Sequence, residues 1–204
     1  MVMKVRYLKS KVEYTYEINK STFIAILYPY HESSDMDAAF SDARKRYPKA
    51  NHYCSASLFG DSMEQQTASD DGEPSRTAGV PILEVLKHHD VTEIICIVVR
   101  YFGGIKLGAG GLVRAYTKAC SEALKLASFY YKVLVPVYEI TFAYSHMDTI
   151  DHFLNNRATI LEKSFTDLIT YTVSLLPEVP DIDDIKHLLI AIQSKDQRLL
   201  QLDA

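Results

Sequence analysis

The chain of 204 residues lacks long apolar runs, paired cysteines and an excess of positive charge. No window holds about 18 consecutive apolar residues, and the first residues lack the apolar core of a secretory signal, so we expect no membrane span and no export. Cys54, Cys96 and Cys120 lie far apart, form no CxxC pair and are odd in number. This pattern argues against a structural zinc site and predicts reduced thiols in the cytoplasm.

Charge and glycine are both distributed unevenly. The formal net charge is −4, which argues against a protein that coats nucleic acid in general. Residues 132–204 carry six Lys plus Arg against eleven Asp plus Glu, hence −5, whereas residues 1–131 are close to neutral. Five of the eight glycines lie between 103 and 111, and none follows. Any function that needs unusual backbone geometry is therefore expected in the first part of the chain.

Residues 1–131 predict one domain of mixed strands and helices. The run 94–99 is apolar and mostly β-branched, which is typical of a strand buried on both faces. Residues 111–128 carry an apolar stripe at helical spacing. In chain order, the expected elements are two strands within 14–30 separated at Asn19 and Lys20, a helix that starts at Ser33 or Ser34 as its cap and stops at Pro48, a strand over 51–60, a polar loop over 61–74, a helix over 77–89, the strand 94–99 and the helix 111–128.

Residues 132–204 predict a second, smaller domain. The expected elements are a strand over 135–144, a helix over 147–157, strands over 159–165 and 168–176, a helix over 182–193 and a short apolar tail over 199–204. This βαββαβ order is that of ferredoxin-like domains. We therefore predict an α+β protein with a domain boundary near residue 131.

The stretch RYFGGIKLGAGGLVRAY (100–116) places a Gly-rich loop between a predicted strand and a predicted helix. Backbone N–H groups and a helix N-terminus make such a loop a general site for anions. The motif GxxxxGK[ST] fails at Ala109 and Gly110, and GxGxxG fails because Val113 stands at the third glycine position. We therefore predict neither an NTPase nor a dinucleotide site. The glycines of the loop are Gly103, Gly104, Gly108, Gly110 and Gly111.

Three cations lie close to this loop in the sequence, namely Arg100, Lys106 and Arg114. Arg114 stands in the first helical turn, where a cation opposes the helix dipole, so we expect a nearby anion to offset it. That anion is either an external phosphate, from RNA or a small molecule, or a carboxylate of the chain that docks against the glycines. The sequence leaves both alternatives open.

The stretch DDGEPSRTAG (70–79) supplies the candidate carboxylates. Its polar members of interest are Asp70, Asp71, Glu73, Ser75 and Thr77. Gly72 suits a turn, Pro74 restricts Glu73 to extended geometry, and Ser75 or Thr77 suits the N-cap of the next helix. A bracing turn is the favoured interpretation, with ligand contact and a metal or acid–base site as alternatives. The spacing is not that of a Ca²⁺ loop, and we predict no metal, no cofactor and no catalytic residue.

His52 and Cys54 stand two residues apart on a predicted strand and therefore face the same way. A cysteine and a histidine in contact can form a nucleophile pair. No signature of an oxyanion hole accompanies them, so a strand histidine and a small buried thiol are the favoured interpretation.

Four stretches closely resemble the Impact family, in its short bacterial YigZ-like branch: NKSTFIA (19–25), ANHYCSA (50–56), DDGEPSRTAGVPIL (70–83) and VVRYFGGIKLGAGGLVRAY (98–116). The resemblance implies a first domain like domain 2 of ribosomal protein S5, followed by a ferredoxin-like domain. That pair is similar to two consecutive domains of elongation factor G. The sequence departs from the family pattern at Arg76, where glycine is usual, and at Ser57, where an aromatic residue is usual.

The resemblance also implies an association with translation. Eukaryotic relatives damp a translation kinase, but they do so with an additional N-terminal domain that is absent from this sequence, so that role is not expected here. Our hypothesis is a non-enzymatic regulator that binds RNA or the ribosome through the loop glycines, Arg76, Arg100, Lys106 and Arg114, with Tyr101 or Phe102 as stacking surfaces. The alternative is an enzyme that acts on a phosphorylated small molecule at the same loop, because S5-like folds also occur in a kinase family.

Overall fold

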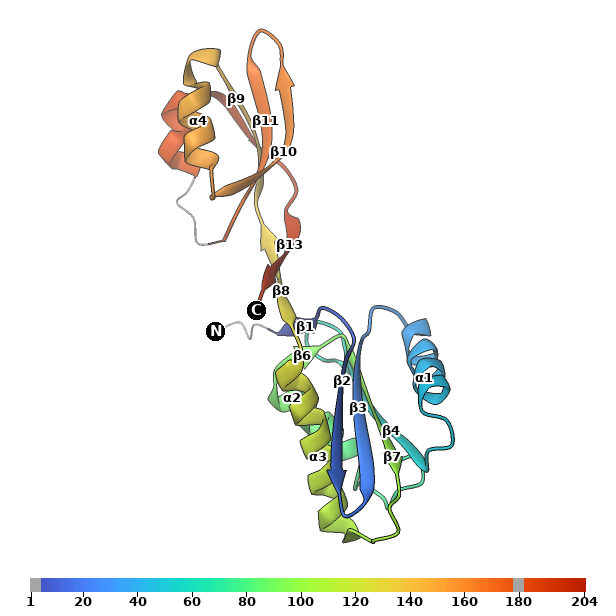
Figure 1. Ribbon diagram of the computed structural model, residues 1–204. Helices are drawn as coiled ribbons and strands as arrows, with labels where there is room; N and C mark the ends of the chain where they lie inside the picture. Colours follow the sequence, from blue (N-terminus) through green and yellow to red (C-terminus); the bar gives the residue numbers. More distant parts are fainter. Residues whose placement is uncertain (1–4, 178–181) are drawn as a thin grey trace. The chain divides into compact units, whose positions relative to one another are not determined.

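The computed structural model describes residues 5–177 and 182–204, which divide into two compact units (Figure 1). The first unit extends to Tyr131 and includes Asp203 and Ala204, and the second comprises Lys132–Leu202. Both units combine strands with helices, so the predicted α+β class is confirmed. Within the described ranges, no helix combines the length and apolar character needed to cross a membrane.

A five-stranded antiparallel sheet forms the centre of the first unit. Its strand order is β2 (Val12–Ile18), β3 (Ser21–Pro29), β7 (Ile94–Tyr101), β4 (His52–Phe59) and β5 (Gln65–Ser69). Asn19 and Lys20 join β2 to β3 with φ angles of 48° and 62°. Positive φ at both turn residues is the type I′ geometry, whose twist matches that of the flanking strands. The predicted break between two strands is confirmed.

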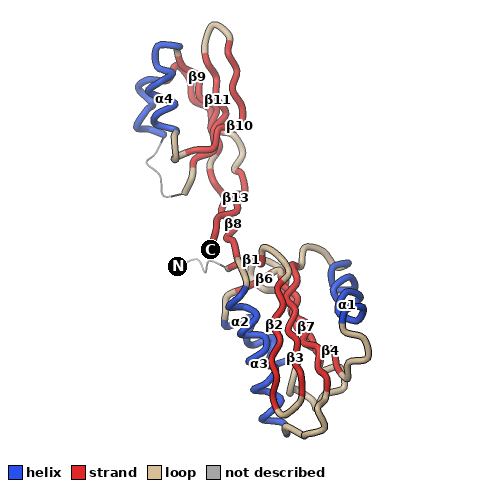
Figure 2. The backbone as a smooth tube through the Cα atoms, in the orientation of Figure 1, coloured by secondary structure: helices blue, strands red, loops and turns tan. Residues whose placement is uncertain are grey.

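Helices cover both faces of this sheet (Figure 2). The helices α2 (Gly79–His88) and α3 (Gly108–Leu126) pack on one face, and α1 (Ser34–Arg46) packs on the other. The side chains of β7 alternate between the two layers: Ile94, Cys96 and Val98 join the core under α2 and α3, and the intervening residues join the core under α1. The prediction of a strand buried on both faces is confirmed.

One local prediction in the first unit is wrong, and another is confirmed only in position. The expected loop 61–74 contains the edge strand β5, whose five residues are all exposed and therefore carry no hydrophobic pattern. Ser33 occupies the N-cap position of α1, as predicted, but its side chain forms no capping hydrogen bond. Asp35 accepts the backbone N–H groups of His31 and Glu32 at 2.7 and 3.0 Å instead, and these hydrogen bonds lower the pKa of Asp35.

A second, small sheet lies at one end of the first unit. Its strand β1 (Arg6–Leu8) pairs in parallel with β6 (Val91–Thr92) and antiparallel with β8 (Phe129–Val135). The last strand, β13 (Arg198–Asp203), completes the sheet. Within the first unit, Lys9 and Asp203 form a 2.5 Å ion pair, and the N–H of Ala204 donates to the carbonyl of Phe129.

The second unit has ferredoxin-like connectivity. Its antiparallel sheet has the order β10 (Ala158–Phe165), β11 (Ile169–Leu175), β9 (Val137–Phe142) and β12 (Leu189–Ser194). A short 3₁₀ turn, η1 (Tyr144–His146), leads into α4 (Met147–Leu154), and a 3₁₀ segment, η2 (Ile182–Leu188), precedes β12. Both α4 and η2 contribute residues to one core, so the split βαβ order is completed by β12.

The predicted helix 182–193 is therefore wrong in its second half. Leu189 and Ile192 pack against the core while their strand pairs with β9. A short apolar run is compatible with a helix or a strand, and here the free edge of β9 determines the outcome. The tail 199–204, expected to follow that helix as the last strand, lies in β13 of the other sheet.

We expect a fragment of residues 1–131 to unfold cooperatively, because β7 and α3 belong to one core. Loss of the exposed pair between Lys9 and Asp203 should cost only about 0–1 kcal/mol. Urea unfolding followed by circular dichroism would test this against the full chain. A fragment without a cooperative transition would show that the boundary near residue 131 is misplaced.

Candidate functional site

A buried ion pair lies between the Gly-rich loop and the stretch 70–79. Arg100, on β7, donates from Nη1 to Oε1 of Glu73 at 2.5 Å, and the two side chains are only 6% and 3% exposed. The Arg100 guanidinium also lies over the rings of Phe23 and Phe102, at 5.2 and 5.4 Å from their centroids. The carboxylate that offsets Arg100 is therefore internal, and this cation faces the core.

Tyr116 and Cys54 extend this pair into a network. Tyr116, on α3, donates its hydroxyl to Oε1 of Glu73 at 2.8 Å. Burial raises the pKa of Tyr116, and the neighbouring Cys54 and Glu73 raise it further. Sequence reasoning assigned Tyr116 only to the apolar stripe of its helix. A tyrosine in the buried stripe of a helix can be recognised as a candidate for such a network, because its hydroxyl needs a hydrogen-bond partner.

Asp70 caps α2 from outside the helix. Its Oδ1 accepts the N–H groups of Ala78 and Gly79 at 3.0 and 2.9 Å, and its Oδ2 accepts that of Arg76 at 2.7 Å. Partial burial opposes ionisation of Asp70, but the three backbone N–H groups outweigh it and lower the pKa of Asp70. The carboxylate thus satisfies the helix N-terminus and interacts favourably with its dipole.

The predicted N-cap role of Ser75 or Thr77 is wrong. No side chain of the residues next to α2 caps it, and the Thr77 hydroxyl donates to the carbonyl of Pro74 at 2.6 Å. Ser75 is exposed. The capping carboxylate lies nine residues before the helix, at a distance that local capping rules do not cover.

Asp71 ties the same turn to β4. Its Oδ2 accepts the N–H of Tyr53 at 2.6 Å, and its carbonyl oxygen lies 2.8 Å from Nδ1 of His52, which donates to it. Asp71 and Gly72 have φ angles of 41° and 86°, so the backbone turns sharply here. Each of the three carboxylates therefore has an internal partner, as a bracing turn requires. In residues 5–177 and 182–204, no group of three or more His, Cys, Asp or Glu is placed to hold a metal ion.

His52 and Cys54 form no hydrogen bond with each other in the described chain. Sγ of Cys54 lies 3.0 Å from the carbonyl oxygen of Asp70 and 3.2 Å from the Tyr116 hydroxyl. Burial raises the pKa of the Cys54 thiol to about 12. Because the thiolate is the nucleophile, this cysteine is unsuited to attack a substrate at neutral pH.

The Gly-rich loop is packed closely where it leaves β7. A Cβ at Gly103 would lie 2.0 Å from the carbonyl carbon of Lys20 in the β2–β3 turn, so a side chain has no room there. Gly104 and Gly108 have φ angles of +84° and +72°, which L side chains rarely adopt. Gly108 is also the first residue of α3, three residues earlier than predicted.

Three cations near the loop remain exposed, namely Arg76, Lys106 and Arg114. No described carboxylate lies within ion-pair distance of any of them, so the alternative in which a carboxylate of residues 70–73 offsets Arg114 is not found. The Arg114 guanidinium instead lies over the first turn of α3, where a Cβ at Gly110 would be 3.5 Å from Nη1. Arg76 and Val113 line one groove of about 600 Å³ between α2 and α3. Arg76 therefore lies beside α3, the helix that carries Arg114.

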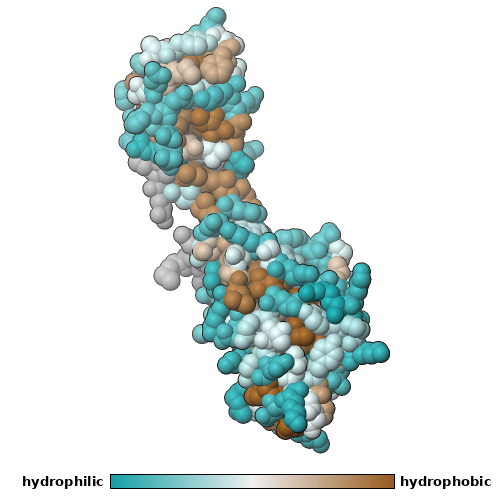
Figure 3. Space-filling view, in the orientation of Figure 1, coloured by the Kyte–Doolittle hydropathy of each residue, from teal (hydrophilic) through white to brown (hydrophobic). Residues whose placement is uncertain are grey.

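Large apolar side chains are exposed beside these cations. Phe102, Ile105 and Val113 are 44%, 43% and 36% exposed. Figure 3 shows hydrophobic and hydrophilic atoms interspersed at the end of the first unit where β7 leads into α3. We call the six residues Arg76, Phe102, Ile105, Lys106, Val113 and Arg114 the loop surface.

We expect Glu73→Gln to destabilise the protein by about 3–5 kcal/mol, because it leaves the Arg100 charge buried without a carboxylate. The double variant Glu73→Gln with Arg100→Met should lose less than the sum of the single changes. Urea unfolding measures all three, with the exposed Glu84→Gln as the matched control. Additive losses would mean that the two side chains do not depend on each other.

We expect no thiol of the native protein to be alkylated readily at pH 8. All three cysteines are free and buried, and the raised pKa of Cys54 keeps its thiolate scarce. Mass spectrometry after iodoacetamide treatment should show no addition to the folded protein and three additions in denaturant. A single addition in denaturant without reductant would reveal a disulfide.

The chain matches the family model of the Impact N-terminal domain over residues 19–124. It is 38% identical over 156 residues to the IMPACT family member YvyE of Bacillus subtilis. This alignment covers 76% of this chain and 72% of the relative. It is 39% identical over 140 residues to the IMPACT family member YigZ of Escherichia coli. This alignment covers 68% of this chain and 69% of the relative.

A solved structure described as that of a hypothetical protein aligns over 96% of this chain and 98% of its own, with 29% identity and a TM-score of 0.61. The sequence matches and this structural match extend over both the glycine loop and the carboxylate turn. The chain belongs to the Impact family.

Proposed function

We propose that this protein is a non-enzymatic, translation-associated regulator that binds RNA or the ribosome through the loop surface. The observation that carries the proposal is a pair of exposed cations at the start of α3, Lys106 and Arg114, which pair with no carboxylate of the described residues. Phosphates are the anions that such a cluster meets in RNA, and phosphate contacts supply most of the sequence-independent affinity. Membership of the Impact family supports the association with translation.

The N-terminus of α3 adds to this attraction. The helix begins Gly-Ala-Gly-Gly, has no side-chain cap and has no acidic residue in its first turn. The first N–H groups of a helix have no partners within it, and its dipole places partial positive charge at this end. Residues 108–110 are exposed, so the backbone of a ligand can approach these N–H groups closely.

Phe102 gives the loop surface a further feature suited to RNA. Its backbone N–H is held by the side-chain oxygen of Asn51 at 2.8 Å, and one side of its ring faces the Arg100 guanidinium. The ring is nevertheless 44% exposed. A fixed, exposed aromatic ring is a surface on which an unpaired base can stack.

The second unit contributes less to this proposal. Residues 132–204 carry a formal charge of −5, which opposes binding to a phosphate backbone. Ferredoxin-like sheets that bind RNA use exposed aromatic rings. On β9 and β11, the positions that alternate with the core carry no aromatic residue, being Val137, Glu139, Thr141, Thr170, Thr172 and Ser174. We therefore assign the contacts with RNA or the ribosome to the first unit.

The site favours binding over catalysis. Asp70, Asp71 and Glu73 are the carboxylates of the neighbouring turn, and each accepts internal hydrogen bonds. None of the three is left to act as a general base or as a magnesium ligand for phosphoryl transfer. The cations of the loop surface can hold phosphates without any further group.

We expect Lys106→Gln with Arg114→Gln to weaken binding to ribosomes and to single-stranded RNA. The slope of log K against log salt is negative, and each lost phosphate contact should lower its magnitude by roughly 0.7 to 0.9. Ribosome co-sedimentation and fluorescence anisotropy over a range of salt concentrations measure this. Melting temperature should hardly change, because neither cation has a carboxylate partner in the described chain.

The matched control removes two positive charges elsewhere, with Lys87→Gln and Lys186→Gln, which lie at exposed positions on different units. This control should retain the salt slope of the unchanged protein. Equal loss in both double variants would indicate an effect of net charge alone and would contradict the assignment to the loop surface. Undiminished binding in Lys106→Gln with Arg114→Gln would also contradict it.

A further inference from the structure

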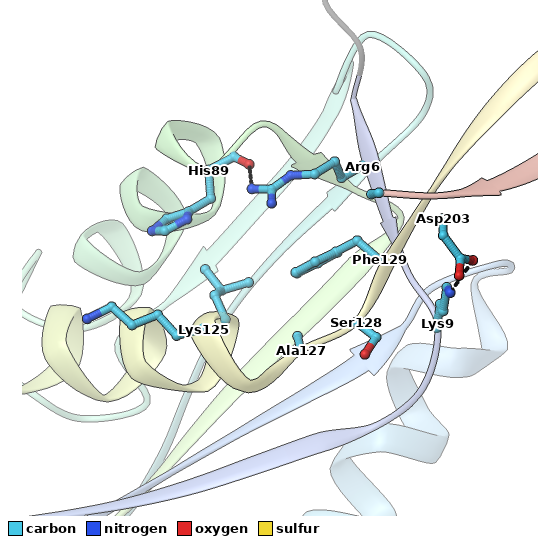
Figure 4. Close-up of a pocket in the computed structure, with 10 residues that line it drawn as sticks. Arg6, Lys9, His89, Lys125, Ala127, Ser128, Phe129 and Asp203 are labelled. Carbon is cyan, nitrogen blue, oxygen red and sulfur yellow. Dashed lines mark hydrogen bonds and ion pairs between the residues drawn. The ribbon is translucent and has the colours of Figure 1, made fainter.

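A polar pocket of about 470 Å³ lies at the other end of α3, in the first unit (Figure 4). With 19 residues, α3 spans roughly 28 Å, so this pocket is remote from Lys106 and from the first turn of α3, although His89 also lines the groove of Arg76 and Val113. Five elements or their ends contribute: β1, the ends of α2, α3 and β13, and the start of β8. The charged, titratable and aromatic residues that line it include Arg6, Lys9, His89, Lys125 and Phe129. We call this the α3-end pocket.

Arg6 provides an uncompensated charge in the α3-end pocket. Its Nη2 donates to the carbonyl oxygen of His89, and its guanidinium lies over the Phe129 ring at 4.8 Å from the centroid. Within the described residues, no carboxylate pairs with Arg6. The other two cations each have one carboxylate: Lys9 pairs with Asp203, and Lys125 pairs with Glu122.

Helix ends account for part of this charge. The C-termini of α2 and α3 both lie at the pocket, and cations are favourable beside the negative end of a helix dipole. Arg6 satisfies one carbonyl there. A guanidinium has five N–H groups, however, and one bond leaves the others for a further acceptor. The helix ends therefore explain the position of Arg6, but they use only part of the hydrogen-bonding capacity of its guanidinium.

The electrostatics around His89 agree with a positive pocket. Burial lowers the pKa of His89, and the nearby charges of Arg6, His88 and Lys125 lower it further, while Asp90 raises it. Figure 4 shows His89 and Lys125 toward one end of the pocket and Lys9 with Asp203 toward the other, with Arg6 and Phe129 between them. An anion near Arg6 would therefore also lie near the imidazole.

We propose that the α3-end pocket binds a small molecule that carries a phosphate group. The phosphate is held by Arg6 and His89, and the exposed side chain of Lys125 closes over it. Arg6 supplies charge-assisted hydrogen bonds, which are stronger than neutral ones. The volume suits a ligand of the size of a mononucleotide, since small-molecule sites usually measure about 300–1,000 Å³. This site is independent of the one proposed for RNA.

The test uses inorganic phosphate and adenosine monophosphate as probes on the full chain. Calorimetry at constant ionic strength, with chloride as the balancing anion, should give saturable binding of at least one probe. Arg6→Gln and Lys125→Gln should each weaken it by about tenfold, the loss expected for one hydrogen bond to a charged group. Lys118→Gln, on α3 but outside the pocket, should bind as the unchanged protein does.

Binding should also raise the pKa of His89, because the phosphate offsets the cations that depress it. A histidine titration by NMR, with and without probe, measures this shift. The charged or titratable groups that face His89 or line the pocket with it are Arg6, Lys9, His88, Asp90, Lys125 and Asp203. A role of these residues in helix capping alone would leave the pKa of His89 unchanged by the probe.

Arg6→Gln removes a hydrogen bond at the end of α2, so Arg6→Lys serves as the charge-retaining variant if the glutamine variant unfolds. Lys125→Gln changes only an exposed pair and tests the proposal on a stable protein. The variant Lys106→Gln with Arg114→Gln should bind both probes normally. Absence of binding up to about 10 mM, or unweakened binding in Lys125→Gln and Arg6→Lys together, would overturn the proposal.

Discussion

The buried pair of Arg100 and Glu73 holds together the part of the first unit on which its candidate function depends. One carboxylate oxygen, Oε1 of Glu73, accepts from both Arg100 on β7 and Tyr116 on α3. Removal of two charges from water costs several kcal/mol per ion, so this arrangement is stable only while both partners are present. The pair therefore fixes the turn 70–79 against the strand and the helix that bracket the Gly-rich loop.

This internal use of carboxylates determines the charge of the surface. Glu73 faces Arg100, Asp71 faces the backbone of β4, and Asp70 faces the N-terminus of α2. None of them compensates Lys106 or Arg114, although all lie in the same region of the first unit. A segment that looks acidic in the sequence thus leaves a cationic surface beside it, because its negative charges are directed inward.

The two ends of α3 carry the two proposed sites for opposite electrostatic reasons. At the N-terminus, unpaired N–H groups and the positive end of the dipole attract anions directly. At the C-terminus, the dipole is negative, and cations gathered to balance it retain donor groups for a ligand. In both proposals, phosphate recognition follows from one helix whose polar neighbours differ at its two ends.

Some features of both units could be predicted from the sequence. The apolar run 94–99 indicated a strand buried on both faces, and the order of elements from 132 onward indicated the ferredoxin-like connectivity. Side chains alternate between the two faces of a strand, so Arg100 lies on the same face as Ile94, Cys96 and Val98. That face lies under α2 and α3. That inference was available from spacing alone, and it separates Arg100 from Lys106 and Arg114.

Other features were decided only by tertiary structure. The edge strand β5 is entirely exposed and exists because β4 offers it a free edge. Residues 189–194 form a strand because β9 offers another, although their sequence is equally compatible with a helix. The sequence by itself determined which residues are charged and which are apolar, whereas packing decided which charges meet. Local patterns report how a residue relates to its own strand or helix, and the partners of a buried charge come from distant parts of the chain.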